Sequence, residues 1–195
     1  NIASAVEHLF LQRELVNSQR DISFTLGEVI EVRSGEAGQQ VRRVAEGSRL
    51  LATLAGLPEK DVDQLWVISP MHDLGKIGIP DSILNKPGKL SNTEFELMKT
   101  HTDIGSNIIG SSSREHLKAG KVVCAQHHEH WDGGGYPNGL AGEDIHLFAR
   151  ITAVVDVFDA LTHARVYKQA WSVEKALEFL RKERGKQFDP RLVDL

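Results

Sequence analysis

The chain has 195 residues, enough for one domain with a sizeable hydrophobic core. Its net charge of −4 and pI of about 6.1 argue against a nucleic-acid polymer or an anionic membrane as the main partner, although metal ions in a cleft can still attract a small anion. Cys124 is the only cysteine, which excludes a disulfide framework and suits a reducing cytosol, and no run approaches the ~18 apolar residues of a membrane span.

Apolar side chains at intervals of three and four predict helical structure over residues 1–33. The polar segment from Gln12 to Glu14 leaves open whether this is one helix or two. The helical pattern starts at Asn1 without an obvious cap, so we expect the chain to be a piece of a larger protein. Residues 1–32 are then a linking or signalling helix, and residues 33–195 form the functional domain.

The rest of the chain is also predicted to be helical. Six further helices are expected, at approximately residues 39–55, 62–71, 91–108, 117–130, 147–162 and 173–185. Ser91 and Glu94 have the spacing of a capping box, and residues 75–90 are expected to form a structured loop. No run alternates with a period of two, so the fold class is all-α, a bundle of about seven helices.

The doublet His72-Asp73 is the first candidate for chemistry. An imidazole and a carboxylate together suit a divalent metal ion. Neighbouring side chains on a regular helix point about 100° apart, so both can reach one metal cluster only at a helix end or if one ligand bridges two ions. Taken alone, the doublet is more often a capped helix end with an exposed histidine.

Three other features add to this doublet. His127-His128 is a second pair near the end of a helix, although such a pair can also be a solvated terminus. Asp156 stands in an apolar helix, where a buried carboxylate must be neutralised, paired or bound to metal. His101 is weaker, because a single helical histidine is usually structural.

The segment Trp131–Gly142 is the most specific feature of the sequence. It holds five glycines, a tyrosine and a proline in twelve residues, so its backbone can approach a ligand closely. The segment directly follows the second histidine pair, which brings it over the presumed metal site.

With these motifs the sequence resembles the HD-GYP family of bacterial phosphodiesterases, from about Phe24 to Leu195. The matching runs are Met71–Asp81, Lys86–Leu90, Met98–His101, His127–Pro137, Asp156–Thr162 and Arg165–Lys168. The resemblance implies an HD-type helical bundle with a Gly-Tyr-Pro loop over the metal site. It implies hydrolysis of a cyclic dinucleotide, cyclic di-GMP before cyclic GMP-AMP, to the linear dinucleotide or to GMP.

The resemblance also implies roles for individual residues. The metal ligands, for two or three iron or manganese ions, would be Glu36, His72, Asp73, His101, His127, His128 and Asp156. Asp73 would bridge two ions, and His72, Asp73 and Lys76 would be catalytic. The residues that bind the nucleotide would be Lys76, Gly135, Tyr136, Pro137, Arg165 and Lys168.

One departure from the family pattern leaves alternatives open. Gln40 stands where the family has a metal-binding histidine, and a glutamine oxygen is a weaker, uncharged ligand. A first alternative is therefore a weak or inactive module that binds the nucleotide. A second is a hydrolase of the broader HD superfamily that acts on another nucleotide, against which the Gly-Tyr-Pro loop and the pair Arg165 and Lys168 weigh.

The charge balance and the N-terminal helix also lead to expectations about partners. We expect an upstream sensory or receiver domain in the same chain, a homodimer through the N-terminal helix, and no nucleic-acid polymer. We expect the domain to be cytoplasmic, within a membrane-tethered or response-regulator protein.

Overall fold

The computed structural model describes residues 2–35, 39–110, 112–164 and 169–195. Three residues with predicted roles, Glu36, Arg165 and Lys168, lie outside the described residues. The α-helices are α1 Ile2–Arg33, α2 Gln40–Leu54, α3 Glu59–Ile68, α4 Asp81–Leu84, α5 Asn92–Lys99, α6 His101–Ile109, α7 Glu115–Gln126, α8 Leu147–Thr162, α9 Val173–Lys182 and α10 Pro190–Val193. Three short 3-10 helices are η1 Ser69–Met71, η2 Leu74–Gly78 and η3 Gly142–Asp144.

The all-α prediction is confirmed, because the described residues contain helices and a single isolated bridge, Arg184 with Phe188, instead of strands. No helix among the described residues is long and apolar enough to cross a membrane. The open question about the N-terminal segment is answered: Ile2–Arg33 form one helix, α1.

The helix expected over residues 91–108 is divided into two. It begins as predicted, with Ser91 accepting from the Glu94 amide and the Glu94 carboxylate accepting from the Ser91 amide. The chain then bends at Thr100, which ends α5 and precedes α6. Its hydroxyl donates to the Leu97 carbonyl at 2.7 Å, a local bond that competes with continuation of the helix. The bend makes His101 the first residue of α6.

Two other expected boundaries are wrong. The helix expected over 117–130 ends at Gln126, so the histidine pair lies in the turn after α7. The helix expected over 173–185 already ends at Lys182, and Gly185, with a positive φ of 73°, lies beyond it. Instead the Gly185 amide donates to the Phe188 carbonyl at 2.9 Å and closes a small turn.

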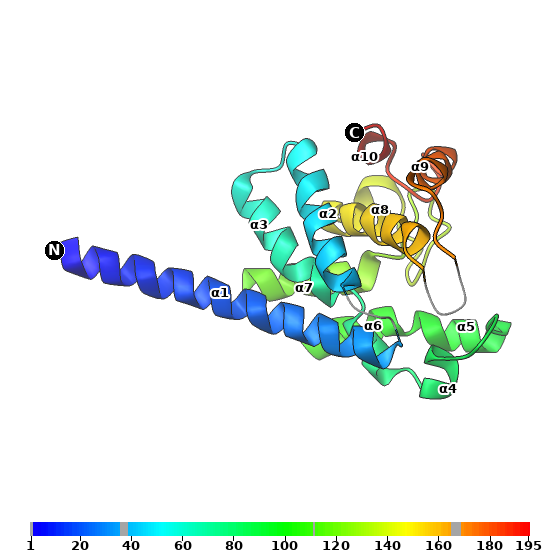
Figure 1. The fold of residues 1–195 in the computed structure, drawn as a ribbon, viewed down its shortest axis with the longest axis horizontal. Coiled ribbons are helices and arrows are strands. Elements are labelled where there is room, and N and C mark those ends of the chain that lie inside the picture. Colours follow the sequence, from blue (N-terminus) through cyan, green and yellow to red (C-terminus); the bar gives the residue numbers. More distant parts are fainter. Residues whose placement is uncertain (1, 36–38, 111, 165–168) are drawn as a thin grey trace.

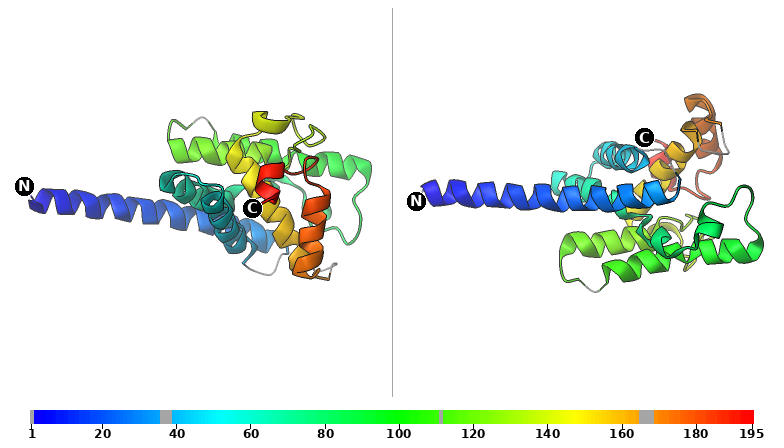
Figure 2. Two further views of the ribbon diagram at one scale, coloured as in Figure 1. Left: turned by 90° about the horizontal axis from the view of Figure 1, so that it is seen from above. Right: turned by 60° about the horizontal axis from the view of Figure 1, so that its bottom comes forward.

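The helices form two groups with α1 between them. Figure 1 and the right view of Figure 2 place α2, α8 and α9 on one side of α1, and α4, α5 and α6 on the other. The first half of α1 extends beyond both groups (Figure 1). Close contact at its second half is possible because Gly27 faces η1, where an added Cβ would lie 2.6 Å from the Pro70 carbonyl oxygen.

The main core joins α2, α3, α7 and α8. Its members include Leu65, Ile68, Val123 and Ile151, each with no exposed surface. Burial of each such side chain contributes about 1.5–3 kcal/mol to folding. This core fixes the end of α7, which His127 and His128 follow, and α8, which carries Asp156. A smaller cluster around Phe24 packs α1 against α2.

Candidate metal centre

The candidate ligands come from separate parts of the chain. His72 and Asp73 lie in the turn between η1 and η2, and His101 begins α6. His127 and His128 follow the last residue of α7, and Asp156 lies within α8. On a regular helix the His72 and Asp73 side chains would point about 100° apart. Here Asp73 has φ −96° and ψ 9°, which are not regular helical values, so both side chains can point toward the same centre.

Four of these residues form one compact set around Asp73. Asp73, His101, His127 and His128 each offer one ligand atom, and these atoms all lie within 4.8 Å of one another. Asp73 Oδ1 is 3.4 Å from His101 Nε2 and 3.8 Å from His127 Nε2. Two ligands on opposite sides of one ion are separated by about 4 Å, since each bond is about 2.0–2.2 Å long. We call these four residues the first set.

A second set shares Asp73 with the first. Asp73 Oδ2 is 3.3 Å from His72 Nε2, and His72 Nε2 is in turn 3.6 Å from Asp156 Oδ1. Gln40 completes this side, since its Nε2 donates to Asp156 Oδ1 at 3.0 Å. The two oxygens of Asp73 therefore face different groups, Oδ1 the first set and Oδ2 the second.

Backbone carbonyls orient three of the imidazoles. The Nδ1 atoms of His72 and His101 each donate to a carbonyl three residues earlier in the chain, at 2.8 Å. His127 Nδ1 lies 3.0 Å from the Val123 carbonyl and 3.1 Å from that of Cys124. A proton held on Nδ1 in this way directs Nε2 toward the centre, the usual arrangement of ligating histidines, and an Nε2 without a proton can bind a metal ion.

The arrangement of these polar atoms suits a bound cation better than it suits a centre without one. His101 Nε2 and His127 Nε2 lie 3.4 Å apart beside Asp73 Oδ1. Both imidazoles donate from Nδ1 to backbone carbonyls, so their Nε2 atoms meet at the carboxylate, as two ligands of one ion would. Among the described residues, His72 Nε2 and Asp73 Oδ1 are also buried without a hydrogen-bond partner. Buried polar atoms of this kind call for an ion, so the residues fit divalent metal binding.

In the metal-free centre the pKa values of the histidines differ widely. Burial alone would lower the pKa of His72, but Asp73 and Asp156 raise it to about 10. Burial lowers the pKa of His101 to about 4, only partly offset by Asp73. Burial also holds the pKa of His128 well below its ordinary value. At neutral pH, therefore, His101 and His128 are ready to bind metal, whereas His72 must first lose a proton.

The loop after the second histidine pair lies against the first set. Tyr136 stacks on His128 with ring centroids 4.8 Å apart, and its backbone amide donates to the His128 carbonyl at 3.1 Å. Gly135 passes so close to this turn that an added Cβ would lie 2.3 Å from the His130 amide nitrogen. Burial raises the pKa of Tyr136, so its hydroxyl stays protonated at neutral pH. The Tyr136-Pro137 peptide bond is cis.

Glu129 anchors this loop and was missed in the sequence. Its side chain is buried, and it accepts from the amides of Asn138 at 2.7 Å and Leu140 at 3.0 Å. A carboxylate that accepts two backbone amides fixes the chain without needing a cation. The one sequence signal was its place between the second histidine pair and the glycine-rich segment.

Two residues that follow Asp73 in the chain, Gly75 and Lys76, shape the surroundings of its carboxylate. Lys76 Nζ donates to Asp73 Oδ2 at 2.5 Å, so in this structure the predicted phosphate-binding lysine lies against a candidate ligand. Gly75 lets η2 pack on the start of α6, since an added Cβ would lie 1.8 Å from the His101 carbonyl oxygen. The need for glycine there comes from a contact between distant segments, which the sequence does not reveal.

Comparisons with known proteins find similar sequences along most of the chain. The family model described as HD domain matches residues 25–192. The chain is 44% identical over 195 residues to the 3′3′-cGAMP-specific phosphodiesterase 2 of Vibrio cholerae, covering 100% of this chain and 37% of that protein. It is 44% identical over 181 residues to the cyclic di-GMP phosphodiesterase response regulator RpfG of Xanthomonas campestris pv. campestris, covering 93% and 48%. The chain thus spans less than half the length of either relative.

A solved structure shares the fold. The HDG"Y"P protein of Bdellovibrio bacteriovorus has a TM-score of 0.67 and 19% identity, covering 96% of this chain and 65% of that one. At this identity the likeness concerns the fold alone, and it supports the helical arrangement around the candidate centre.

Proposed function

Because the chain belongs to the HD domain family, within its HD-GYP group, we propose that it is a metal-dependent phosphodiesterase that hydrolyses a cyclic dinucleotide. Cyclic di-GMP is the first candidate substrate and 3′3′-cGAMP the second, since the two relatives named above act on these nucleotides. The product of cyclic di-GMP is the linear dinucleotide, or GMP after a second cleavage.

The observation that carries this proposal is the pair of ligand sets that share Asp73. Asp73 Oδ1 faces His101 and His127, and Oδ2 faces His72, as expected of a carboxylate that bridges two ions. When bound, two such ions acidify water and stabilise charge on the attacking and leaving oxygens of a phosphodiester.

We propose iron or manganese as the resident metal. The described donor set consists of imidazoles and carboxylates, which suit these ions, whereas a thiolate would favour softer or zinc sites. Cys124 is not part of it, because its buried thiol donates to the Met71 carbonyl at 3.0 Å. Glu36 is our proposed ligand for a third ion.

The protein side chains would orient the substrate around these ions. We assign the phosphate groups to Lys76, Arg165 and Lys168, whose positive charges suit non-bridging oxygens. The Gly135-Tyr136-Pro137 segment would bind the nucleotide beside His128, with the Tyr136 hydroxyl as a donor. In the reaction water attacks phosphorus and the 3′ oxygen of the ribose leaves, which opens the ring.

A metal analysis combined with a turnover assay tests this function. Protein purified without oxygen should contain two or three equivalents of iron or manganese. It should convert cyclic di-GMP to the linear dinucleotide or GMP, with 3′3′-cGAMP assayed in parallel. Bound metal without turnover of either nucleotide would contradict the proposed activity.

A second candidate function is a binding module with little or no hydrolysis. Gln40 favours it, because its amide is a hydrogen-bond donor to Asp156 where an imidazole would offer a lone pair. The same assay separates the two functions: a module of this kind would bind cyclic di-GMP and leave it intact.

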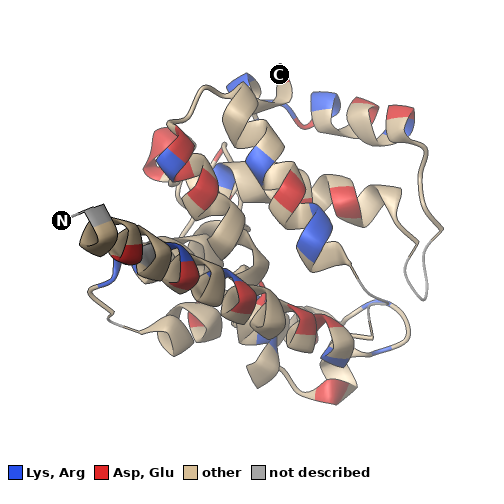
Figure 3. Ribbon diagram, turned by 60° about the vertical axis from the view of Figure 1, so that its left-hand side comes forward, with Lys and Arg blue, Asp and Glu red and all other residues tan. Residues whose placement is uncertain are grey.

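We propose that α1 joins two copies of the chain. Apolar Leu15, Ile22 and Val29 recur every seven residues, as the a positions of a coiled-coil seam do. Leu11 and Val32 stand at two of the d positions, and polar Ser18 and Thr25 stand at the other two. Each of the five apolar side chains is more than half exposed. Acidic residues recur every seven positions beside this seam, at Glu7, Glu14, Asp21 and Glu28, and red bands recur along α1 in Figure 3.

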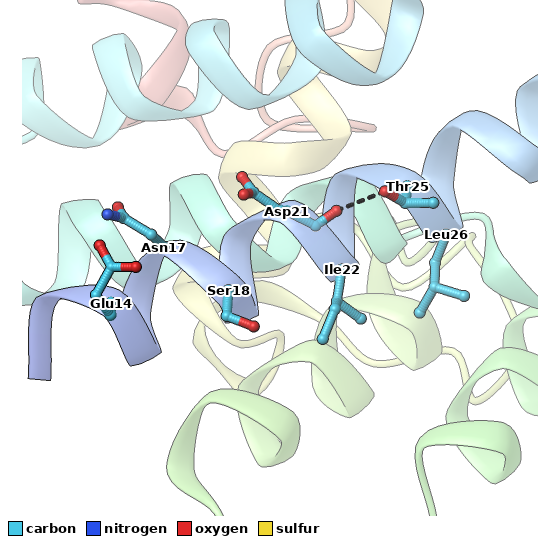
Figure 4. Close-up of a pocket in the computed structure, with 7 residues that line it drawn as sticks. All are labelled: Glu14, Asn17, Ser18, Asp21, Ile22, Thr25 and Leu26. Carbon is cyan, nitrogen blue, oxygen red and sulfur yellow. Dashed lines mark hydrogen bonds between the residues drawn. The ribbon is translucent and has the colours of Figure 1, made fainter. Parts of the chain in front are cut away.

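The surface of α1 carries a hollow of about 410 Å³ lined by Glu14, Asn17, Ser18, Asp21, Ile22, Thr25 and Leu26. All of these residues belong to one helix, and Ile22 and Leu26 point to the same side in Figure 4. A hollow with a single helix for its wall does not enclose a small molecule, and it includes none of the candidate ligands. It suits the side chains of a second helix.

We further propose an upstream sensory or receiver domain and a cytoplasmic location. An upstream domain is supported by a response regulator among the relatives, of which this chain covers 48%. The lone, buried Cys124 suits a reducing compartment. Nothing in the charge balance favours a nucleic-acid polymer as partner.

A further inference from the structure

We propose that Arg33, the last residue of α1, is a positioning residue for the candidate metal centre, aided by Glu31 in the same turn. This inference rests on the proposed function, since it concerns the same site. It adds two residues that contact no candidate substrate. They act through the segments that carry Asp73 and Gln40.

Arg33 holds the 3-10 helix that follows Asp73. Its guanidinium donates from Nη1 to the Lys76 carbonyl at 2.5 Å and from Nη2 to the Ile79 carbonyl at 2.6 Å. These carbonyls lie at the C-terminal end of η2, where a cation is favoured, and the Lys76 carbonyl also accepts from the Ile79 amide at 3.1 Å. Arg33 therefore completes the end of this short helix.

The ion pair of Arg33 is a lesser contact. Arg33 Nη2 lies 2.8 Å from Asp81 Oδ1, but the Asp81 side chain is 74% exposed. Exposed ion pairs contribute little. The two hydrogen bonds to carbonyls are the contacts that fix the segment. An alanine in place of Arg33 would have no side-chain donor for them.

Lys76 connects Arg33 to the centre. The Lys76 amide donates to the Asp73 carbonyl at 2.9 Å, and its Nζ donates to Asp73 Oδ2 at 2.5 Å. A shift of the Lys76 backbone would therefore move the carboxylate that both ligand sets share. Asn85, which follows α4, makes a further contact with the end of α1, since its Nδ2 donates to the Arg33 carbonyl at 3.2 Å.

Glu31 holds the other side of the centre. Its buried carboxylate accepts from the Gln40 amide at 2.8 Å and from the Val41 amide at 3.4 Å. Gln39, the residue before α2, provides no side-chain cap, so Glu31 supplies from α1 the acceptor that this helix start needs. The Gln40 side chain then reaches Asp156.

The last turn of α1 also adjoins the centre directly. A cavity of about 20 Å³ is lined by Glu31 and Gln40 together with His72, Asp73 and Lys76, among others. The same helix turn therefore contacts the segments that carry both ligand sets. A displacement of this turn would alter their relative position.

Arg33→Ala tests the proposal, with Arg42→Ala as the matched control. Arg42 links α2 to α1 through an exposed ion pair with Glu28 at 2.8 Å and lies over the Phe24 ring of α1. We expect Arg33→Ala to weaken Mn²⁺ binding and to lower kcat by about 10- to 100-fold, with KM little changed. Arg42→Ala and Asp81→Ala should leave both quantities near the wild-type values.

Arg33→Lys provides the conservative rescue and guards against loss of folding. Its ammonium can donate to one of the two carbonyls, so metal affinity and kcat should fall between those of wild type and Arg33→Ala. Metal affinity and kcat in Arg33→Ala equal to those of Arg42→Ala would overturn the proposal, as would an equal loss in Asp81→Ala. Lack of turnover in a wild-type chain that binds Mn²⁺ would overturn the proposed function alone, because the titration still judges Arg33. A wild-type chain that binds neither Mn²⁺ nor Fe²⁺ would overturn both.

Discussion

Gln40 donates a hydrogen bond from its side-chain amide to Asp156 Oδ1 at 3.0 Å, joining the start of α2 to the middle of α8. Both side chains are largely removed from solvent, and Asp156 is also 3.6 Å from His72 Nε2. The glutamine thus stands beside the second ligand set as a donor to one of its carboxylates. It does not offer a nitrogen lone pair.

The first prediction concerns this residue. Gln40→His should strengthen metal binding at the second set by about 1–3 kcal/mol, because an imidazole lone pair replaces an amide donor. Hydrolysis of cyclic di-GMP should rise with it. Mn²⁺ titration and a turnover assay measure both effects. Gln64→His, on α3 beside Glu115, is the control for nonspecific binding by an added histidine. Unchanged metal stoichiometry and turnover in Gln40→His would mean that glutamine is already adequate there.

The second prediction concerns the shared carboxylate. Asp73→Asn should lower the metal content at both sets and abolish turnover, since one side chain faces His72 on one side and His101 on the other. Metal analysis and the same assay check this. Asp63→Asn, at an exposed position of α3, should change neither quantity. Retained turnover in Asp73→Asn would show that the catalytic centre lies elsewhere.

The third prediction concerns pH. In the metal-free protein the pKa of His72 is about 10 and that of His101 about 4. Below pH 10, His72 must lose a proton before it binds metal, so uptake at the second set should release about one proton and strengthen about tenfold for each pH unit. Calorimetry in buffers of different protonation enthalpy measures that proton. A pH-independent affinity at the second set would contradict the assignment of His72, whereas His101 is already neutral above pH 4 and should release none.

The fourth prediction concerns the seam on α1. Leu15→Asn should weaken dimer formation, because Leu15 lies on the proposed seam. Val16→Asn is a close control, since the neighbouring side chain is equally exposed, 55% against 54%, but lies off the seam. Sedimentation analysis compares the masses of both variants and of a chain without residues 1–20. A monomeric wild type, or equal masses for the two variants, would argue against the seam.

Local sequence decided much of the fold. The apolar run within Leu147–Thr162 predicted α8 at its observed bounds, because a helix that is buried along most of its length needs apolar residues on most of its surface. Ser91 and Glu94 predicted the start of α5, because a capping box involves groups only three residues apart. The doublets and the glycine-rich segment indicated which side chains would meet, although their roles as metal ligands stay predictions.

Tertiary structure alone decided how the segments that carry the candidate ligands are held in place. Glu31 caps the start of α2, Arg33 completes the end of η2, and Glu129 anchors the loop over His128. In the sequence Glu31 and Arg33 are ordinary charged residues, since nothing local distinguishes them from a solvated helix face. Their partners are backbone groups, which every residue carries, so no side-chain pattern marks the contact. Only the packing of distant segments brings Glu31 to the amides at the start of α2, Arg33 to the carbonyls at the end of η2, and Glu129 to the amides of the loop.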